Sequence, residues 1–302
     1  MTSNDNYCHI LLKLSEEPIN NHLTSWISAT NFTHQSLNRS NLYIISGRPK
    51  ALFDGYQFCD QRLLIFLRIK IGNEIFSFGE INLKKLINLT ANKDFDLQKL
   101  EIDARDEVLF INYNKERIQV LTPDGILMRK GRNKEYISGF DNYLEAMTFD
   151  VYYIGIGTGN QNSYTRLIKN GHKNRSNIPI LEEEHIYILL FELEPITVKI
   201  INNTQSHNEV DFNMDLNYYS LIKDAEKALI KIMQPKYNKQ KYCNYPKGSD
   251  GIYNKGFNSY SYIIDEGIKL RFDNKRQEIG EADAISITGD HLSIERSKNS
   301  FF

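Results

Sequence analysis

The run Phe149-Asp-Val-Tyr-Tyr-Ile-Gly-Ile-Gly-Thr-Gly-Asn160 is the segment that best predicts the fold of this chain. Its first eight residues are rich in aromatic and β-branched side chains, which is typical of a strand. A glycine-rich turn closes the run. A short helix is expected next, with Asn162 or Ser163 as its N-cap and its end at Gly171. The pattern predicts a strand, a turn and a helix in direct succession.

A longer helix is expected from about Asn217 to Met233, followed by Pro235, which cannot continue it. Four apolar residues at helical spacing form one stripe along it: Tyr219, Ile222, Leu229 and Met233. Glu226 lies on the same stripe, where a carboxylate is costly to bury unless it is paired or bound to a cation. Two interpretations stay open, a glutamate bonded to a neighbouring strand at the edge of the core and a metal ligand.

The chemistry-bearing residues follow one another in a particular order. Tyr153-Ile-Gly155 ends the predicted strand, Arg166 lies on the next helix, and His172 follows that helix. The later helix carries Glu226 and leads through a proline to Asn238. This order resembles that of the GIY-YIG nuclease superfamily.

The resemblance implies a metal-dependent endonuclease that hydrolyses phosphodiester bonds, with DNA favoured over RNA. Glu226 would bind one Mg²⁺ or Mn²⁺ ion, and Arg166 would hold the scissile phosphate through its planar fork. Tyr153 would position the attacking water or accept its proton, and His172 would assist this transfer or hold the phosphate. Asn238 would fix the loop after the helix by hydrogen bonds.

The resemblance covers roughly residues 136–245 and lacks one part of the family's signature. No Gly-Ile-Tyr tripeptide precedes Tyr153, although its tyrosine is the usual candidate for the general base in the family. The nearest substitutes are Tyr136 and Tyr143, and Tyr152 is expected to point to the opposite face of the strand from its neighbour. The identity of the base therefore stays open. A catalytically inactive module that binds nucleic acid or another partner is the alternative.

Two basic runs without acidic residues accompany the candidate site. The first extends from Arg166 to Arg175, and the expected substrate-binding residues in it are Lys169, Lys173 and Arg175. The second covers residues 227–249, where lysines alternate with tyrosines. Lysines can follow phosphates while tyrosines stack on unpaired bases. The plainer interpretation is that both runs are solvated surfaces.

The glycine-rich turn also allows a second interpretation, that of a nucleotide-binding protein. Gly155-Ile-Gly-Thr-Gly159 follows a strand and precedes a helix, as in a dinucleotide-binding fingerprint. Asn160, however, occupies the place of the third glycine, and no strand ends in an acid about twenty residues further on. This interpretation is therefore disfavoured.

Composition limits the broad class of the protein. The chain has 302 residues, 25% of them charged, and a net charge of −1, so a polyanion-binding surface must be local. The three cysteines have no metal-ligand spacing, and no segment has the length and apolarity of a signal peptide or membrane span. A soluble, cytoplasmic protein is expected.

The fold class predicted is α+β, with three consecutive parts. Residues 1–130 read as a β-rich domain, 131–245 as a small GIY-YIG-like α/β nuclease module, and 246–302 as a C-terminal β extension. The first part shows no catalytic cluster. It is expected either to recognise a substrate or partner or to hold subunits together in a homo-oligomer. By analogy of architecture, defence against foreign nucleic acid such as phage would suit a nuclease joined to such a domain.

Overall fold

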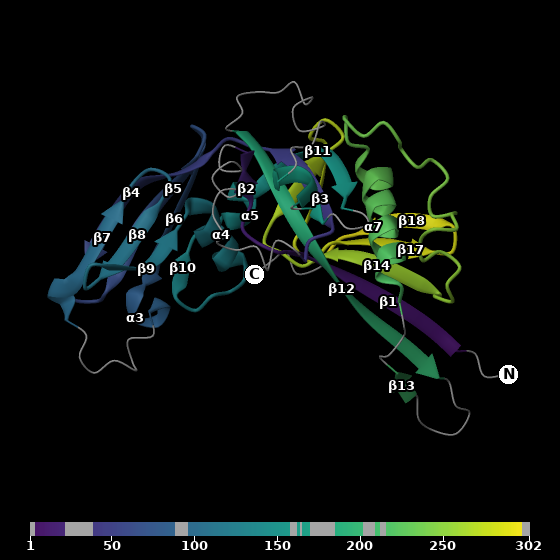
Figure 1. Ribbon diagram of the computed structural model, residues 1–302, viewed down its shortest axis with the longest axis horizontal. Helices are drawn as coiled ribbons and strands as arrows, with labels where there is room; N and C mark the ends of the chain where they lie inside the picture. Colours follow the sequence, from purple (N-terminus) through teal and green to yellow (C-terminus); the bar gives the residue numbers. More distant parts are fainter. Residues whose placement is uncertain are drawn as a thin grey trace. The chain divides into compact units, whose positions relative to one another are not determined.

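The computed structural model describes residues 4–21, 39–87, 96–157, 162–163, 165–169, 185–201, 209–211 and 216–297. The chain forms two compact units (Figure 1). Unit 1 comprises residues 1–47, 149–266 and 270–302, and unit 2 comprises 48–148 with 267–269. Unit 2 is therefore inserted into the sequence of unit 1, rather than preceding it as the division at residues 130 and 245 assumes.

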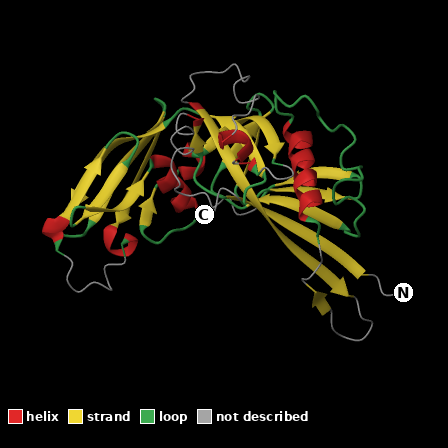
Figure 2. Ribbon diagram, in the orientation of Figure 1, coloured by secondary structure: helices red, strands yellow, loops and turns green. Residues whose placement is uncertain are grey.

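Unit 1 is built on one eleven-stranded sheet (Figure 2). Its strands are β1 (Asn4–Leu14), β2 (Ile19–Asn20), β3 (Leu42–Gly47), β11 (Thr148–Ile156), β12 (Ile186–Ile201), β13 (Glu209–Asp211), β14 (Ser259–Ile264), β15 (Lys269–Phe272), β16 (Gln277–Gly280), β17 (Ala284–Thr288) and β18 (His291–Glu295). Nine of them follow the order β16-β15-β11-β3-β12-β1-β14-β17-β18, while β2 and β13 both pair with β12. The helical elements are η4 (Thr165–Lys169), a single wide turn, and α7 (Tyr218–Met233).

Strand pairing over long sequence distances holds unit 1 together. β1 pairs antiparallel with β12 along its whole length, from Asn4 opposite Ile201 to Leu14 opposite Phe191. Its other edge pairs in parallel with β14. The sequence suggests two strands, 185–193 and 197–201, whereas β12 is continuous through this region. The C-terminal strands thus belong to the same sheet as the first strand.

The predicted fold class is wrong. The described part of the chain is mostly β, with 47% strand and 18% helix, and nine strands form a nearly closed sheet instead of a small α/β nuclease module. The error arises because strand pairing joins segments far apart in sequence, which local patterns do not reveal. The local strand–turn–helix pattern does not form an independent module, because its strand β11 lies inside a large sheet between β3 and β15.

Unit 2 contains two smaller antiparallel sheets. One has the order β10-β6-β5-β4 and the other β7-β8-β9. The strands are β4 (Ala51–Cys59), β5 (Leu64–Ile71), β6 (Ile75–Asn82), β7 (Leu100–Ala104), β8 (Leu109–Tyr113), β9 (Glu116–Leu121) and β10 (Ile137–Gly139). The short helices are α3 (Leu83–Leu86), η3 (Leu97–Lys99), α4 (Pro123–Gly131) and α5 (Tyr143–Ala146).

Helix α4 occupies a segment that the sequence presents as a turn and a linker. Thr122 caps it by accepting a hydrogen bond from the Gly125 amide at 2.9 Å, and Pro123 stands in the first turn. Both are signals of a helix start that the Pro-Asp-Gly turn pattern obscured. No helix in the described part of the chain is long and apolar enough to cross a membrane.

Candidate active site

Two tyrosines on adjacent strands form the centre of the candidate site. β3 and β11 pair antiparallel, with Tyr43 opposite Gly155 and Ile45 opposite Tyr153. The Tyr43 and Tyr153 rings stack with centroids 6.0 Å apart. Gly155 is required here, since a Cβ at this position would lie 2.6 Å from the Tyr43 ring. The glycine of the Tyr-Ile-Gly tripeptide therefore makes room for a tyrosine from the neighbouring strand.

Tyr43 is the functional candidate that sequence reasoning missed. The substitutes considered for the absent tripeptide, Tyr136 and Tyr143, belong to unit 2. Tyr43 lies on β3, and unit 2 separates it from Tyr153 in sequence. A tyrosine in the strand that directly precedes unit 2 is the feature that could have pointed to Tyr43.

Tyr152 does not follow simple strand alternation. The pairing register of β11 shifts between Val151 and Tyr153, which is a β-bulge at Tyr152. Tyr152 and Tyr153 consequently both pack against the same hydrophobic cluster, in contrast to the expected opposite faces. Tyr152 also meets the Tyr237 ring edge-on at 6.5 Å.

Asn238 connects the segment after α7 to β11. Its side-chain oxygen accepts a hydrogen bond from the Ile154 amide at 2.9 Å, and its Nδ2 donates to the Ile154 carbonyl at 2.7 Å. Asn238 is only 7% exposed. These two buried hydrogen bonds satisfy the Ile154 backbone as a paired strand would, and they fix the backbone between Tyr153 and Gly155.

Helix α7 positions Glu226 close to where the sequence predicts it. Asn217 caps the helix by accepting from the Ser220 amide at 3.1 Å, and Gln234 ends it in the left-handed conformation. Tyr219, expected on the apolar stripe, is 46% exposed, but Ile222, Leu229 and Met233 are buried as expected. Glu226 itself is partly buried.

The Glu226 carboxylate has no hydrogen bond or ion pair with any described residue. The next residue, Lys227, is paired instead with Asp250. Lys223, one turn before, lies over the Tyr219 ring at 4.4 Å. The nearby lysines therefore do not neutralise Glu226 by direct contact.

Burial and charge act against each other on Glu226. Burial raises the pKa of its carboxyl group from 4.5 to about 7, and the Arg166 charge is the largest influence in the opposite direction. A buried glutamate whose pKa is raised toward neutrality and is influenced by a nearby guanidinium is typical of a functional site. The carboxylate is available to a proton or to a cation.

Arg166 reaches the site from η4, the turn that follows β11. The Asn162 side chain caps this turn by accepting from the Thr165 amide at 2.8 Å, one of the two caps expected. The Arg166 guanidinium donates to the Ile156 carbonyl at the end of β11. This bond orients the guanidinium while other N–H groups remain for an anion.

Electrostatic contacts join these elements. Burial raises the pKa of Tyr43 above its ordinary range, with Tyr153 adding to the rise, Arg166 opposing it and Glu226 adding to it. The strand tyrosines, the guanidinium and the helix-borne carboxylate thus lie close enough to influence one another's charge. Because its pKa is raised, Tyr43 is a neutral hydroxyl at physiological pH.

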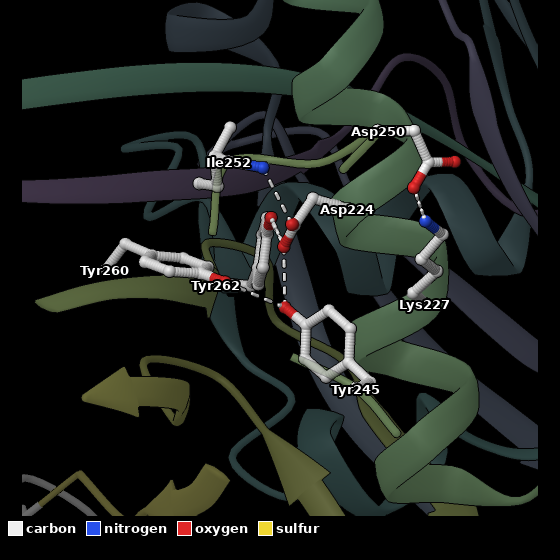
Figure 3. Close-up of polar contacts among 7 residues, drawn as sticks. All are labelled: Asp224, Lys227, Tyr245, Asp250, Ile252, Tyr260 and Tyr262. Carbon is white, nitrogen blue, oxygen red and sulfur yellow. Dashed lines mark hydrogen bonds and ion pairs between the residues drawn. The ribbon is translucent and has the colours of Figure 1, made fainter. Parts of the chain in front are cut away.

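A second acidic residue on α7 has a different role. Asp224 is 1% exposed and accepts hydrogen bonds from the Tyr245 hydroxyl at 2.6 Å, the Tyr262 hydroxyl at 2.8 Å and the Ile252 amide at 2.9 Å (Figure 3). Burial raises the pKa of its carboxyl group, and the three donors oppose the rise. Asp224 anchors the segment after α7 to the helix and to β14.

Several expected site residues fall outside the described part of the chain. These are His172, Lys173 and Arg175. Lys169 ends η4, but its side chain is not among those described. The geometry of the site therefore consists of Tyr43, Tyr153, Arg166, Glu226 and Asn238.

The donor set limits the metal that this site would suit. Among the described residues no three His, Cys, Asp or Glu side chains gather as a metal-binding group. A single carboxylate fits Mg²⁺ or Mn²⁺, which keep several waters and need few protein ligands, and does not fit a structural zinc ion.

Comparison with protein-family models, curated proteins and solved structures gives no significant match.

Proposed function

We propose that the protein is a metal-dependent endonuclease that hydrolyses phosphodiester bonds in nucleic acid, with DNA favoured. The observation that carries this proposal is the partly buried Glu226 carboxylate, which has no counter-ion bonded to it among the described residues and is influenced by the charge of Arg166. A cation-binding carboxylate next to a phosphate-binding guanidinium is the minimal equipment for this reaction.

Each residue has a role that follows from its chemistry. Glu226 would hold one Mg²⁺ or Mn²⁺ ion, which when bound stabilises negative charge on the leaving oxygen. Arg166 would bind the non-bridging oxygens of the scissile phosphate with the N–H groups not used by Ile156. The partly buried Tyr153 would orient the attacking water by its hydroxyl group, the fully buried Tyr43 would support the Tyr153 ring by stacking, and Asn238 would keep β11 in place.

Within this proposal, the resemblance to the GIY-YIG superfamily concerns the functional residues and not the fold. We propose that Tyr43 takes the part of the tyrosine in the family's first tripeptide. Asn41 and Leu42 stand where the family has glycine and isoleucine. The inserted unit 2 would account for the separation between Tyr43 and Tyr153 in sequence.

A non-enzymatic function is the second candidate. The raised pKa of Tyr43 disfavours a tyrosinate that could remove a proton from water. This observation favours a module that binds nucleic acid without cleaving it. The two candidates differ in turnover and not in binding.

Cleavage assays on the full chain test the proposal. We expect labelled single-stranded and double-stranded DNA to be cut when Mg²⁺ or Mn²⁺ is added and to stay intact with EDTA. RNA of the same sequence is the comparison for substrate class. Binding without cleavage under either metal would support the non-enzymatic candidate. If the protein neither binds nor cleaves nucleic acid, both candidate functions are contradicted.

The affinity for Mn²⁺ is expected to depend on pH. Protons and metal compete for Glu226, whose pKa is raised to about 7 in the metal-free site. Below that value the dissociation constant should rise about tenfold for each unit of pH lost, and above it the affinity should level off. Electron paramagnetic resonance titration of Mn²⁺ measures this. An affinity unchanged on the two sides of neutrality would exclude Glu226 as the ligand.

A further inference from the structure

The segment after α7 encloses a hollow of about 370 Å³ on the surface of unit 1. It is lined by the segment Gln240–Tyr245 together with Lys227 and Lys247. A second hollow of about 530 Å³ shares Cys243–Tyr245 and Lys247 with it. We call the first of these the 240–247 hollow.

The 240–247 hollow is anchored to the helix. Tyr245, in its lining, donates its hydroxyl hydrogen bond to the buried Asp224 (Figure 3). The Lys231 ammonium donates to the Cys243 carbonyl at 2.9 Å, and Lys241 donates to the Pro235 carbonyl. Side chains therefore fix the lining backbone at several points, so that the hollow is preformed.

Tyr242 connects the hollow to the candidate active site. It lines the hollow and also interacts electrostatically with Glu226 and Tyr153. Burial, followed by the charge of Glu226, raises its pKa to about 12. Its backbone adopts φ of 48°, which is uncommon for a non-glycine residue and is often found where a side chain is held for function. Lys227, which follows Glu226 on α7, also lines the hollow, so that a ligand in the hollow would lie near the proposed metal ligand.

The charge around the hollow is positive. Lys227 and Lys247 are paired with the exposed residues Asp250 and Asp290. Lys241, the third lysine of the lining, has no ion pair with any residue in the described ranges. Lysines that have no nearby carboxylate attract phosphate groups.

We propose that the 240–247 hollow is a subsite for one unpaired nucleotide adjacent to the scissile phosphate, so that the substrate is single-stranded or frayed at the cut. This inference rests on the proposed function. Lys241 would bind the phosphate of this nucleotide and the Tyr242 ring would stack on its base. Stacking tolerates every base, and the hollow has the volume of a small-ligand site, too narrow for a duplex.

Binding in EDTA tests the subsite without turnover. Fluorescence anisotropy would compare a labelled oligothymidylate with a duplex of equal length, using the full chain. We expect Tyr242→Leu to weaken binding of the single strand about tenfold, since a stacked base contributes roughly that much, and Tyr242→Phe to bind as the wild type. Tyr219→Leu removes an exposed tyrosine of α7 that does not line the hollow, and is expected to leave the affinity unchanged.

A charge variant gives a second, independent readout. Lys241→Gln should weaken single-strand binding and reduce the slope of log affinity against log salt by about one, whereas the exposed Lys255→Gln should not. The proposal is overturned if Tyr242→Leu and Lys241→Gln bind like their controls, or if the duplex is bound as tightly as the single strand. Because no metal is present, failure of cleavage would contradict the proposed nuclease but leave this result standing.

Discussion

Glu226→Gln is expected to lower metal-dependent cleavage by about a thousandfold or more, since loss of a group that stabilises transition-state charge has effects of this size. The amide keeps the shape of the side chain but removes the charge that holds the cation. Cleavage rates at saturating Mg²⁺ measure the effect, with the exposed Glu295→Gln as the matched control. Retention of more than about a tenth of the activity would be incompatible with the role given to Glu226.

Stability distinguishes a lost function from a lost fold. The folded-state pKa of Glu226, about 7, is higher than its ordinary value of 4.5, so ionisation opposes folding of the metal-free protein. This destabilisation is absent when the pH is below the ordinary pKa of 4.5. It grows as the pH rises toward the folded-state pKa of about 7 and is constant above that pH. The glutamine variant lacks it. The variant should therefore be at least as stable as the wild type at neutral pH, while inactive.

Asp224→Ala is expected to lower the free energy of unfolding by about 3 kcal/mol or more. The carboxylate accepts hydrogen bonds from Tyr245, Tyr262 and the Ile252 amide, and removing it leaves three buried donors without their acceptor. Urea unfolding, followed by far-ultraviolet circular dichroism, measures the change.

The control for Asp224 is the exposed ion pair one turn away. Asp250→Ala breaks its contact with Lys227, and exposed pairs contribute at most about 1 kcal/mol. If Asp224→Ala unfolds like Asp250→Ala, then the buried cluster in Figure 3 does not anchor the segment after α7.

Two local elements of the candidate site were correctly predicted from the sequence. The helix expected from Asn217 to Met233 is α7, with Asn217 as its cap, and the strand expected from Phe149 to Ile156 is β11. Both depend on side-chain periodicity and on capping residues, which act within a few turns of the chain. Asn162, which caps the turn after β11, was predicted from the same kind of local signal.

Long-range pairing could not be predicted in this way. β1 pairs with β12 and β14, from Leu14 opposite Phe191 to Tyr7 opposite Ser259, so both partners lie far away in sequence. Nothing in a local pattern specifies which strands meet, and the predicted nuclease module failed for this reason. The same difficulty concealed Tyr43, because unit 2 lies between it and Tyr153.

Asp224 shows a second limit of the sequence. It lies on α7 two residues before Glu226, and the groups that donate hydrogen bonds to it come from segments beyond the helix. In the sequence, Asp224 and Glu226 are both acidic residues on the buried side of a predicted helix. The helical pattern does not reveal that Asp224 is bonded to two tyrosines while Glu226 is not. Only their partners distinguish an anchor from a candidate ligand.

The most direct test of the account is a crystal structure of the protein soaked in Mn²⁺, with anomalous diffraction collected to locate the ion. The account predicts an anomalous peak about 2.1 Å from a Glu226 carboxylate oxygen, on the side that faces Arg166. An ordered Mn²⁺ elsewhere with none at Glu226, or a direct Glu226–Arg166 ion pair that leaves no room for a cation, would contradict it.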